Sequence, residues 1–88
     1  MAVSVYVISV AAEMVGTGVQ NLRAYERAGL VTPSRTAGGT RLYSSADVER
    51  LQRVAALLQA GLNLVGIAMV LELEDENAGL RRRLERHG

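Results

Sequence analysis

The sequence predicts a mainly α-helical fold with a small β wing, in which a winged helix-turn-helix is followed by a C-terminal dimerisation helix. Three observations carry this prediction. Apolar residues recur at helical spacing in four separate segments. A glycine-bearing break lies between the first two segments, and a Gly-Gly reversal beside β-prone residues lies between the second and the third. At 88 residues the chain has room for one small domain with a modest core.

The first segment predicts a short strand that leads into a short helix. Val3, Val5 and Val7 alternate with other residues at the period of two that a half-buried strand shows. Ser9 is a favourable N-cap, so the helix is expected over residues 10–15.

Residues 16–18, Gly-Thr-Gly, are the predicted turn between two helices, and the second helix is expected over residues 19–28. Two N-caps fit its start. Thr17 can form a capping box with Gln20, whereas Gly18 is tolerated as a cap at little cost. With either cap the order is helix, tight turn, helix.

The segment after the second helix predicts a β-ribbon, or wing. Pro33 cannot continue a helix, and the Gly-Gly pair at 38–39 marks a reversal of the chain. Thr40, Leu42 and Tyr43 suit a returning strand.

The last two helices are marked by their caps. Ser44 with Asp47 three residues later predicts the start of a third helix, which Gly61 stops. Asn63 is expected to cap the fourth helix. The apolar stripes are Val48, Leu51, Val54, Ala55 and Leu58 in the third helix, and Leu64, Ile67 and Leu71 in the fourth.

Composition excludes several classes of function. The chain has no cysteine and one histidine, His87, so cysteine and histidine ligands cannot hold zinc or copper, and no metal or cofactor is expected. No set of residues typical of catalysis appears, so an enzyme is not expected. The apolar opening contains Glu13 and is shorter than the ~20 residues that span a bilayer. A cytoplasmic protein without a membrane partner is therefore expected.

The charges point to an anion only through their placement, because the net charge is +1. All ten basic residues are arginines, which suit phosphate, but a GC-rich genome would produce the same bias and is the preferred explanation. Gln20, Arg23, Ala24 and Arg27 share one face of the second helix. In a helix-turn-helix this helix enters the major groove, and the small Ala24 would allow close approach. An ordinary helix with a solvated face would show the same pattern.

A second basic element follows in the predicted wing. Arg35 and Arg41 flank the Gly-Gly turn, and Tyr43 lies on the returning strand. These side chains can hold phosphates while the helix reads base edges. The alternative is a plain hairpin with a packing tyrosine, and both can hold, since a tyrosine can bury its ring and still present its hydroxyl.

Four motifs follow one another along the chain. They are Leu-Arg-x-Tyr-Glu-Arg-x-Gly-Leu at 22–30, Gly-x-Arg-x-Tyr-Ser at 39–44, Asp47-Val48, and Gly-x-x-Leu-x-x-Ile at 61–67. In this order and spacing they resemble the N-terminal winged-helix domain of the MerR family of bacterial transcription regulators. Within the family, "VISVAAEMVG", "SRTAGGTRLYS" and "GLNLVGIAMVLELE" are most similar to the HspR-type heat-shock repressors and their short relatives.

The resemblance implies a regulator that binds double-stranded DNA sequence-specifically, as a homodimer on an inverted-repeat operator. At the HspR level it implies a repressor of heat-shock or chaperone genes, with a chaperone co-regulator as a candidate partner. Ala24 stands where many members carry a second aromatic residue, so one contact is expected to be missing. The residues expected to bind DNA are Gln20, Asn21, Arg23, Tyr25, Arg27, Arg35, Arg41 and Tyr43.

The winged helix-turn-helix is expected over residues 1–71 and the dimerisation helix over 72–88. A heptad pattern predicts a dimer seam of Val70, Leu73, Asn77, Leu80 and Leu84. The acidic block "ELEDE" can face the partner's basic block "RRRLER" in an antiparallel coiled coil, and the resemblance implies this orientation. A parallel pair also brings acidic and basic residues together. The alternative is a frayed, solvated helix end, which Gly79 would favour.

Two other functions remain open beside transcription regulation. One is a chaperone-modulating module that binds a protein and needs no DNA. The other is an excisionase-like architectural protein, which bends DNA without regulating transcription.

Overall fold

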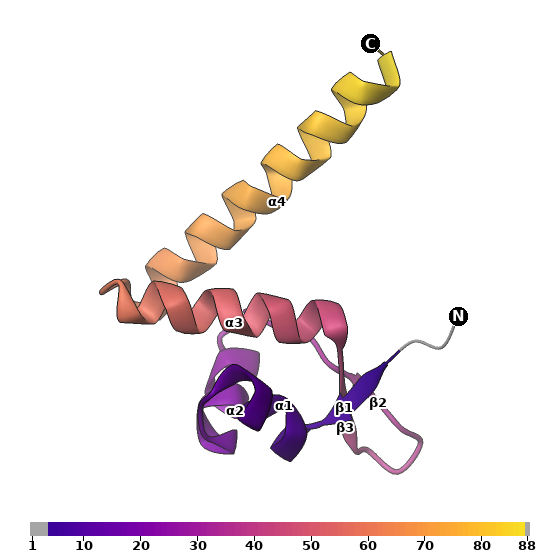
Figure 1. The fold of residues 1–88 in the computed structure, drawn as a ribbon, viewed down its shortest axis with the longest axis vertical. Helices are drawn as coiled ribbons and strands as arrows, with labels where there is room; N and C mark the ends of the chain where they lie inside the picture. Colours follow the sequence, from indigo (N-terminus) through magenta and orange to yellow (C-terminus); the bar gives the residue numbers. More distant parts are fainter. Residues whose placement is uncertain (1–3, 88) are drawn as a thin grey trace.

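The computed structural model describes residues 4–87. The elements follow in the order β1 (Val5–Val7), α1 (Ile8–Val15), α2 (Val19–Arg27), β2 (Ser34–Arg35), β3 (Arg41–Ser44), α3 (Ser45–Gln59) and α4 (Leu64–His87). Helices α1 and α2 and the small sheet lie against one side of α3, and α4 leaves the end of α3 as a projecting arm (Figure 1). The predicted mainly helical fold with a small wing is confirmed.

The turn between α1 and α2 depends on Gly16. Its φ is +82°, a left-handed conformation that a residue with a Cβ adopts only under strain. The Gly16 amide donates to the Ala12 carbonyl at 2.9 Å, and the Thr17 amide donates to the same carbonyl at 3.0 Å. These bonds satisfy the end of α1 and turn the chain into α2.

The caps of the first two helices differ in part from the prediction. Helix α1 begins at Ile8, directly after β1, with Val7 at the N-cap and no side-chain cap, so the predicted Ser9 cap is wrong. The pairing of Val7 with β3 holds the chain extended up to the first residue of the helix. At α2 the N-cap is Gly18, and the alternative cap, Thr17, accepts a bond from the Asn21 side chain instead.

The three strands form one antiparallel sheet in the order β1-β3-β2. Tyr6 lies opposite Tyr43, and Arg35 lies opposite Arg41. The wing turn is closed by the Gly39 amide, which donates to the Thr36 carbonyl at 2.9 Å. The sequence predicted the ribbon of β2 and β3, but not that β1 extends it to three strands. Residues so far apart in the chain leave no local pattern of their pairing.

The caps of α3 and α4 are as predicted. The Asp47 amide donates to Ser44 Oγ at 3.0 Å, and the Ser44 amide donates to the Asp47 carboxylate at 2.9 Å. At the start of α4, Asn63 Oδ1 accepts from the Gly66 amide at 2.8 Å. The core between the helices and the sheet contains Ala11, Ala12, Leu22, Tyr25, Leu30, Val31, Tyr43, Val48, Leu51, Val54, Leu57, Ile67 and Leu71.

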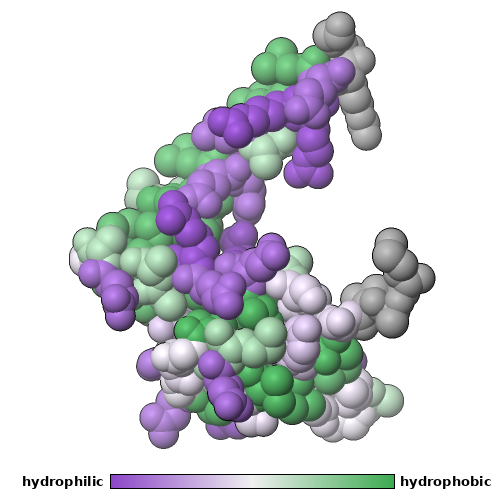
Figure 2. Space-filling model, in the orientation of Figure 1, coloured by the Kyte–Doolittle hydropathy of each residue, from purple (hydrophilic) through white to green (hydrophobic). Residues whose placement is uncertain are grey.

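Helix α4 runs without a break across the domain boundary expected after residue 71. Leu71 is the last buried residue of α4 up to residue 85, and residues 72–85 are exposed apart from the half-buried Gly79. Apolar surface runs along one edge of this arm, and polar surface covers the side toward the domain (Figure 2). None of the helices in residues 4–87 has an apolar stretch long enough to cross a membrane.

Candidate nucleic-acid interface

The outer face of α2 carries the predicted polar residues. Leu22 and Tyr25 turn into the core, which leaves the other side of this short helix to solvent. Exposed there are Gln20, Asn21, Arg23 and Arg27. Neither Arg23 nor Arg27 forms an ion pair with any residue between 4 and 87. Two guanidinium groups on one helix face are thus available to an anion such as a phosphate.

Asn21 has a structural contact at the start of the same helix. Its Nδ2 donates to Thr17 Oγ1 at 2.7 Å. The side-chain oxygen of Asn21 has no partner within the described residues, so it can still accept a bond from a ligand. The contact fixes the Asn21 side chain at the N-terminal end of α2, which is the end that goes deepest into the groove in a helix-turn-helix.

Two residues expected at the DNA surface lie in the core. Tyr25 is 6% exposed, because it shares the inward face of α2 with Leu22. Tyr43 is fully buried, because β3 is the central strand and its side chain points toward the helices. The Tyr43 hydroxyl has no hydrogen-bond partner among the residues that the structure describes. The structure therefore contradicts a phosphate contact from this hydroxyl and a groove-facing position for the Tyr25 ring.

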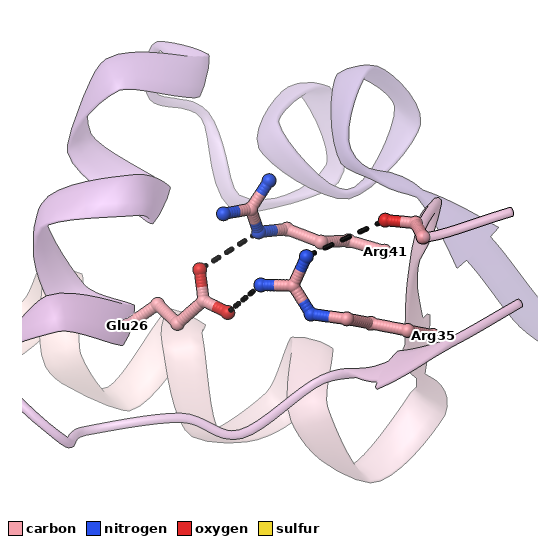
Figure 3. Close-up of polar contacts among 4 residues, drawn as sticks. Glu26, Arg35 and Arg41 are labelled. Carbon is pink, nitrogen blue, oxygen red and sulfur yellow. Dashed lines mark hydrogen bonds and ion pairs between the residues drawn. The ribbon is translucent and has the colours of Figure 1, made fainter.

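The wing arginines do not stand alone (Figure 3). Arg35 Nη2 donates to Glu26 Oε1 at 3.1 Å, and Arg41 Nε donates to Glu26 Oε2 at 2.7 Å. Arg35 Nη1 also donates to the Gly39 carbonyl at 3.4 Å. One carboxylate from the last turn of α2 therefore bridges both strands of the wing. The sequence prediction of two arginines at the wing is confirmed, but their pairing with a common acid was missed.

A signal for this bridge was present in the sequence. An acidic residue in the last turn of a helix lies beside the negative end of the helix dipole, which is unfavourable. A nearby cation would offset this repulsion. Glu26 occupies such a position on α2. Its side chain is only 19% exposed, against 48% for Arg35 and 29% for Arg41.

The bridge also lies beside the buried tyrosine. Burial raises the pKa of the Tyr43 hydroxyl above its ordinary value of 10.0, and the charge of Glu26 raises this pKa further. The positive charges of Arg41 and Arg35 act on this pKa in the opposite direction, but they do not cancel the effect of burial. The phenol is therefore held in its neutral form.

The exposed stripe on α4 differs from the predicted heptad seam. Val70, the first residue of the predicted seam, is half-buried and packs against the core. The large exposed apolar residues of α4 are Val65, Met69, Leu73, Leu80 and Leu84. Val65 and Met69 lie outside the seam that the sequence predicted, and the seam itself stays a prediction. A groove of about 390 Å³ runs beside them, lined by Ala28, Leu64, Val65, Ala68, Met69 and Glu72.

The acidic block on α4 is partly used within the chain. Glu74 pairs with Arg53 at 2.8 Å, and Asp75 pairs with Arg50 at 3.3 Å, both across the angle between α3 and α4. These two acids therefore have arginine partners within the chain, and the pairing of the whole block with a partner's basic block stays a prediction. Glu72 and Glu76 form no ion pair within the described residues and stay exposed.

Most of the chain is similar in sequence to known proteins. Residues 6–74 match the family described as MerR HTH family regulatory protein. A candidate heat shock protein HspR of Streptomyces coelicolor is 52% identical over 80 residues, which cover 90% of this chain and 53% of that protein. The transcriptional regulator GlnR of Bacillus anthracis is 37% identical over 68 residues, with 77% and 53% covered. The chain spans about half the length of these curated relatives.

Solved structures share the fold. A MerR family transcriptional regulator from Bacillus cereus superposes with a TM-score of 0.73 at 26% identity, over 92% of this chain and 66% of that one. HiNmlR, a MerR family regulator that lacks the sensor domain, has a TM-score of 0.73 at 23% identity, over 93% of this chain and 80% of that one.

Proposed function

Because the chain belongs to the MerR family of helix-turn-helix regulatory proteins, we propose that it binds double-stranded DNA sequence-specifically and regulates transcription. The main support for this proposal is the outer face of α2. Arg23 and Arg27 are exposed there and form no ion pair within the described residues, and Gln20 and Asn21 lie on the same face. The second helix of this motif lies in the major groove. The structure of HiNmlR, which has the same fold, is of a complex with promoter DNA.

The 52% identity with the HspR relative supports a narrower assignment. On this basis the protein is a cytoplasmic repressor of heat-shock or chaperone genes, and a chaperone is a candidate co-regulator. The operator is an inverted repeat, since a two-fold dimer presents the same helix twice.

The apolar stripe on α4 supports a homodimer. The spacing between Val65 and Met69 recurs between Leu80 and Leu84. In an antiparallel pair Val65 of one copy lies beside Leu84 of the other, Met69 lies beside Leu80, and Leu73 lies near the centre. Every large apolar residue of the stripe is then covered.

Charge favours the antiparallel arrangement over the parallel one. Glu76 and Arg83 line the same groove as Leu80, so they lie on the stripe itself. A parallel pair would set each of them against its own counterpart, which places like charges side by side. In the antiparallel register Glu76 meets the apolar Leu73 and Arg83 meets Gly66, so this repulsion is absent.

Titration of the protein with its own upstream region tests the DNA-binding proposal. Fluorescence anisotropy should show tight binding to that duplex and weaker binding to a scrambled one of equal length. The logarithm of affinity should fall steeply with the logarithm of salt concentration, by about 0.9 for each phosphate neutralised. No binding to any duplex would favour the chaperone-modulating alternative, and equal binding to both duplexes would favour the architectural one.

A further inference from the structure

We propose that Glu26 is a positioning residue that sets DNA specificity, because it ties the wing to α2 and withholds two arginine charges from phosphates. The inference rests on the proposed DNA binding. It concerns an acid at the edge of a basic surface, where a negative charge by itself would repel DNA. Such a residue requires a physical reason for its place.

The contact geometry supplies the first reason. Each oxygen of the Glu26 carboxylate accepts from a different arginine, and the two arginines come from the two strands of the wing. Figure 3 shows each oxygen of the Glu26 carboxylate facing one of the two arginine side chains. A single side chain on α2 thus holds β2 and β3 at once, which restricts rotation of the wing relative to the helix.

The lack of other anchoring in this part of the wing supplies the second reason. Residues 34–40, which include β2 and the turn, are all exposed, so no buried side chain fastens them to the core. Arg35 and Arg41 are direct cross-strand partners, and like charges directly opposite each other destabilise a sheet. Glu26 is the acid that pairs with both of them within residues 4–87. It therefore supports the pairing of the strands as well as their position.

The charge balance supplies the consequence for DNA. Glu26 and the two arginines together carry a charge of +1, so the wing attracts phosphates less than two unpaired arginines would. Phosphate contacts raise the affinity for every sequence alike, whereas contacts to base edges depend on the correct placement of α2. Glu26 thus lowers sequence-independent affinity and keeps the wing in the position that suits the site read by α2.

The test compares Glu26→Gln, which keeps the side-chain shape, with Glu49→Gln, which removes an exposed acid of α3 that has no ion pair within residues 4–87. Both variants change the net charge equally. For Glu26→Gln we expect tighter binding to a scrambled duplex and a salt slope steeper by about one to two, as one or two arginines are freed. The ratio of specific to non-specific affinity should fall about tenfold, the scale of one base contact. Glu49→Gln should change this ratio far less.

Two further measurements separate position from charge. Glu26→Asp keeps the charge but is one methylene shorter and cannot reach both arginines, so it should lose specificity while its salt slope stays closer to the wild type. Amide hydrogen exchange without DNA should quicken at Thr36 and Gly39, whose amides close the wing turn, in Glu26→Gln but not in Glu49→Gln.

An unchanged specificity ratio in Glu26→Gln, or unchanged exchange in the wing, would overturn the proposal. The two readouts also separate it from the proposed function. If the wild type binds no duplex, the DNA-binding proposal and the specificity role fail together, while the exchange data still decide whether Glu26 positions the wing. If the wild type binds its site and Glu26→Gln behaves like Glu49→Gln, only the inference about Glu26 fails.

Discussion

Tyr43 combines a fully buried ring with a hydroxyl that has no hydrogen-bond partner in the described part of the chain. A buried hydroxyl without a hydrogen bond costs about 1–3 kcal/mol relative to one that is paired. Burial of the ring between the sheet and the helices offsets this unfavourable free energy, and Tyr43 is among the largest fully buried side chains. Its place in the family-like wing motif is therefore explained by packing rather than by DNA contact.

We expect Tyr43→Phe to raise the free energy of unfolding by about 1 kcal/mol at pH 7, because it removes the unpaired hydroxyl and keeps the ring. The folded-state pKa of Tyr43 lies above the unfolded value of 10.0. The stability that the neutral phenol contributes is thus complete below that pH and is lost as pH rises through the folded-state pKa.

Urea unfolding from pH 7 to about pH 11 checks this, and the variant should lose less stability than the wild type at the alkaline end. Tyr6 and Tyr25 are present in both proteins, so the difference reports Tyr43. The DNA affinity of the Tyr43→Phe variant should equal that of the wild type. Weaker DNA binding by the phenylalanine variant would show that the hydroxyl reaches a phosphate after all.

Arg23 differs from the wing arginines, because it is exposed and has no carboxylate partner within the described residues. If it reads a base edge, Arg23→Ala should weaken specific binding by about 1–3 kcal/mol and relax the preference at one operator position. Titration of duplexes that carry single substitutions measures this. An equal loss on all sequences would reduce Arg23 to a phosphate contact.

At the scale of elements, Arg50 connects three parts of the fold. From α3 it donates to the Leu30 carbonyl, just beyond α2, at 2.5 Å, and it pairs with Asp75 of α4 at 3.3 Å. Within the described residues, Arg53 of α3 makes only the surface pair with Glu74. The Arg50 side chain thus contacts both the segment that follows α2 and helix α4. Ion pairs that are this exposed contribute little by themselves, so the bond to the Leu30 carbonyl decides how much Arg50 matters.

We therefore expect Arg50→Ala to lower the free energy of unfolding by about 1–2 kcal/mol, because the Leu30 carbonyl loses a charge-assisted donor. Arg53→Ala, the matched variant, should lose less than about 1 kcal/mol. Urea unfolding of the two variants gives the comparison. Equal small losses would mean that water replaces Arg50 at the carbonyl.

At the scale of the whole molecule, α4 projects from a domain whose own core ends at Leu71 (Figure 1). An exposed row of large apolar residues on such an arm is costly for an isolated chain in water. The proposed antiparallel pairing removes this cost and sets the distance between two α2 helices. Operator spacing would then follow from the length and the angle of α4.

A pair of opposite charges, introduced one at a time on the apolar stripe, tests the orientation of the dimer. Met69→Lys should yield a monomer, because it places a charge on the stripe opposite Leu80 of the other copy. Adding Leu80→Glu should restore dimerisation in the antiparallel register, where the new charges meet, but not in a parallel pair. Ala78→Lys, on another face of α4, serves as the control and should stay dimeric.

Sedimentation equilibrium measures the oligomeric state of each variant. The monomeric variant should bind a full operator no better than a half-site, since the two linked contacts are lost. A wild type with full affinity for an isolated half-site would contradict the dimer proposal.

Local sequence patterns were enough to predict the order of the helices, the Gly16 turn, the Ser44 capping box and the Asn63 cap. Each of these depends on residues within three or four positions of one another, and such interactions form the same way wherever the segment lies. The wing motif and the α2 motif could be recognised in the sequence for the same reason. These motifs also indicated the family. The polar face of α2 followed from helical periodicity alone.

Which of those residues are available to a ligand depends on the packing of the whole fold. Tyr25 and Tyr43 are buried, and Arg35 and Arg41 meet Glu26, because segments distant in sequence come together around one small core. Ile67, Val70 and Leu71 of α4 pack against that core. Val65 and Met69 therefore lie on the exposed face of the helix. Periodicity shows that a helix has an apolar side, but when a helix has two, only the position of its neighbours determines which one is covered.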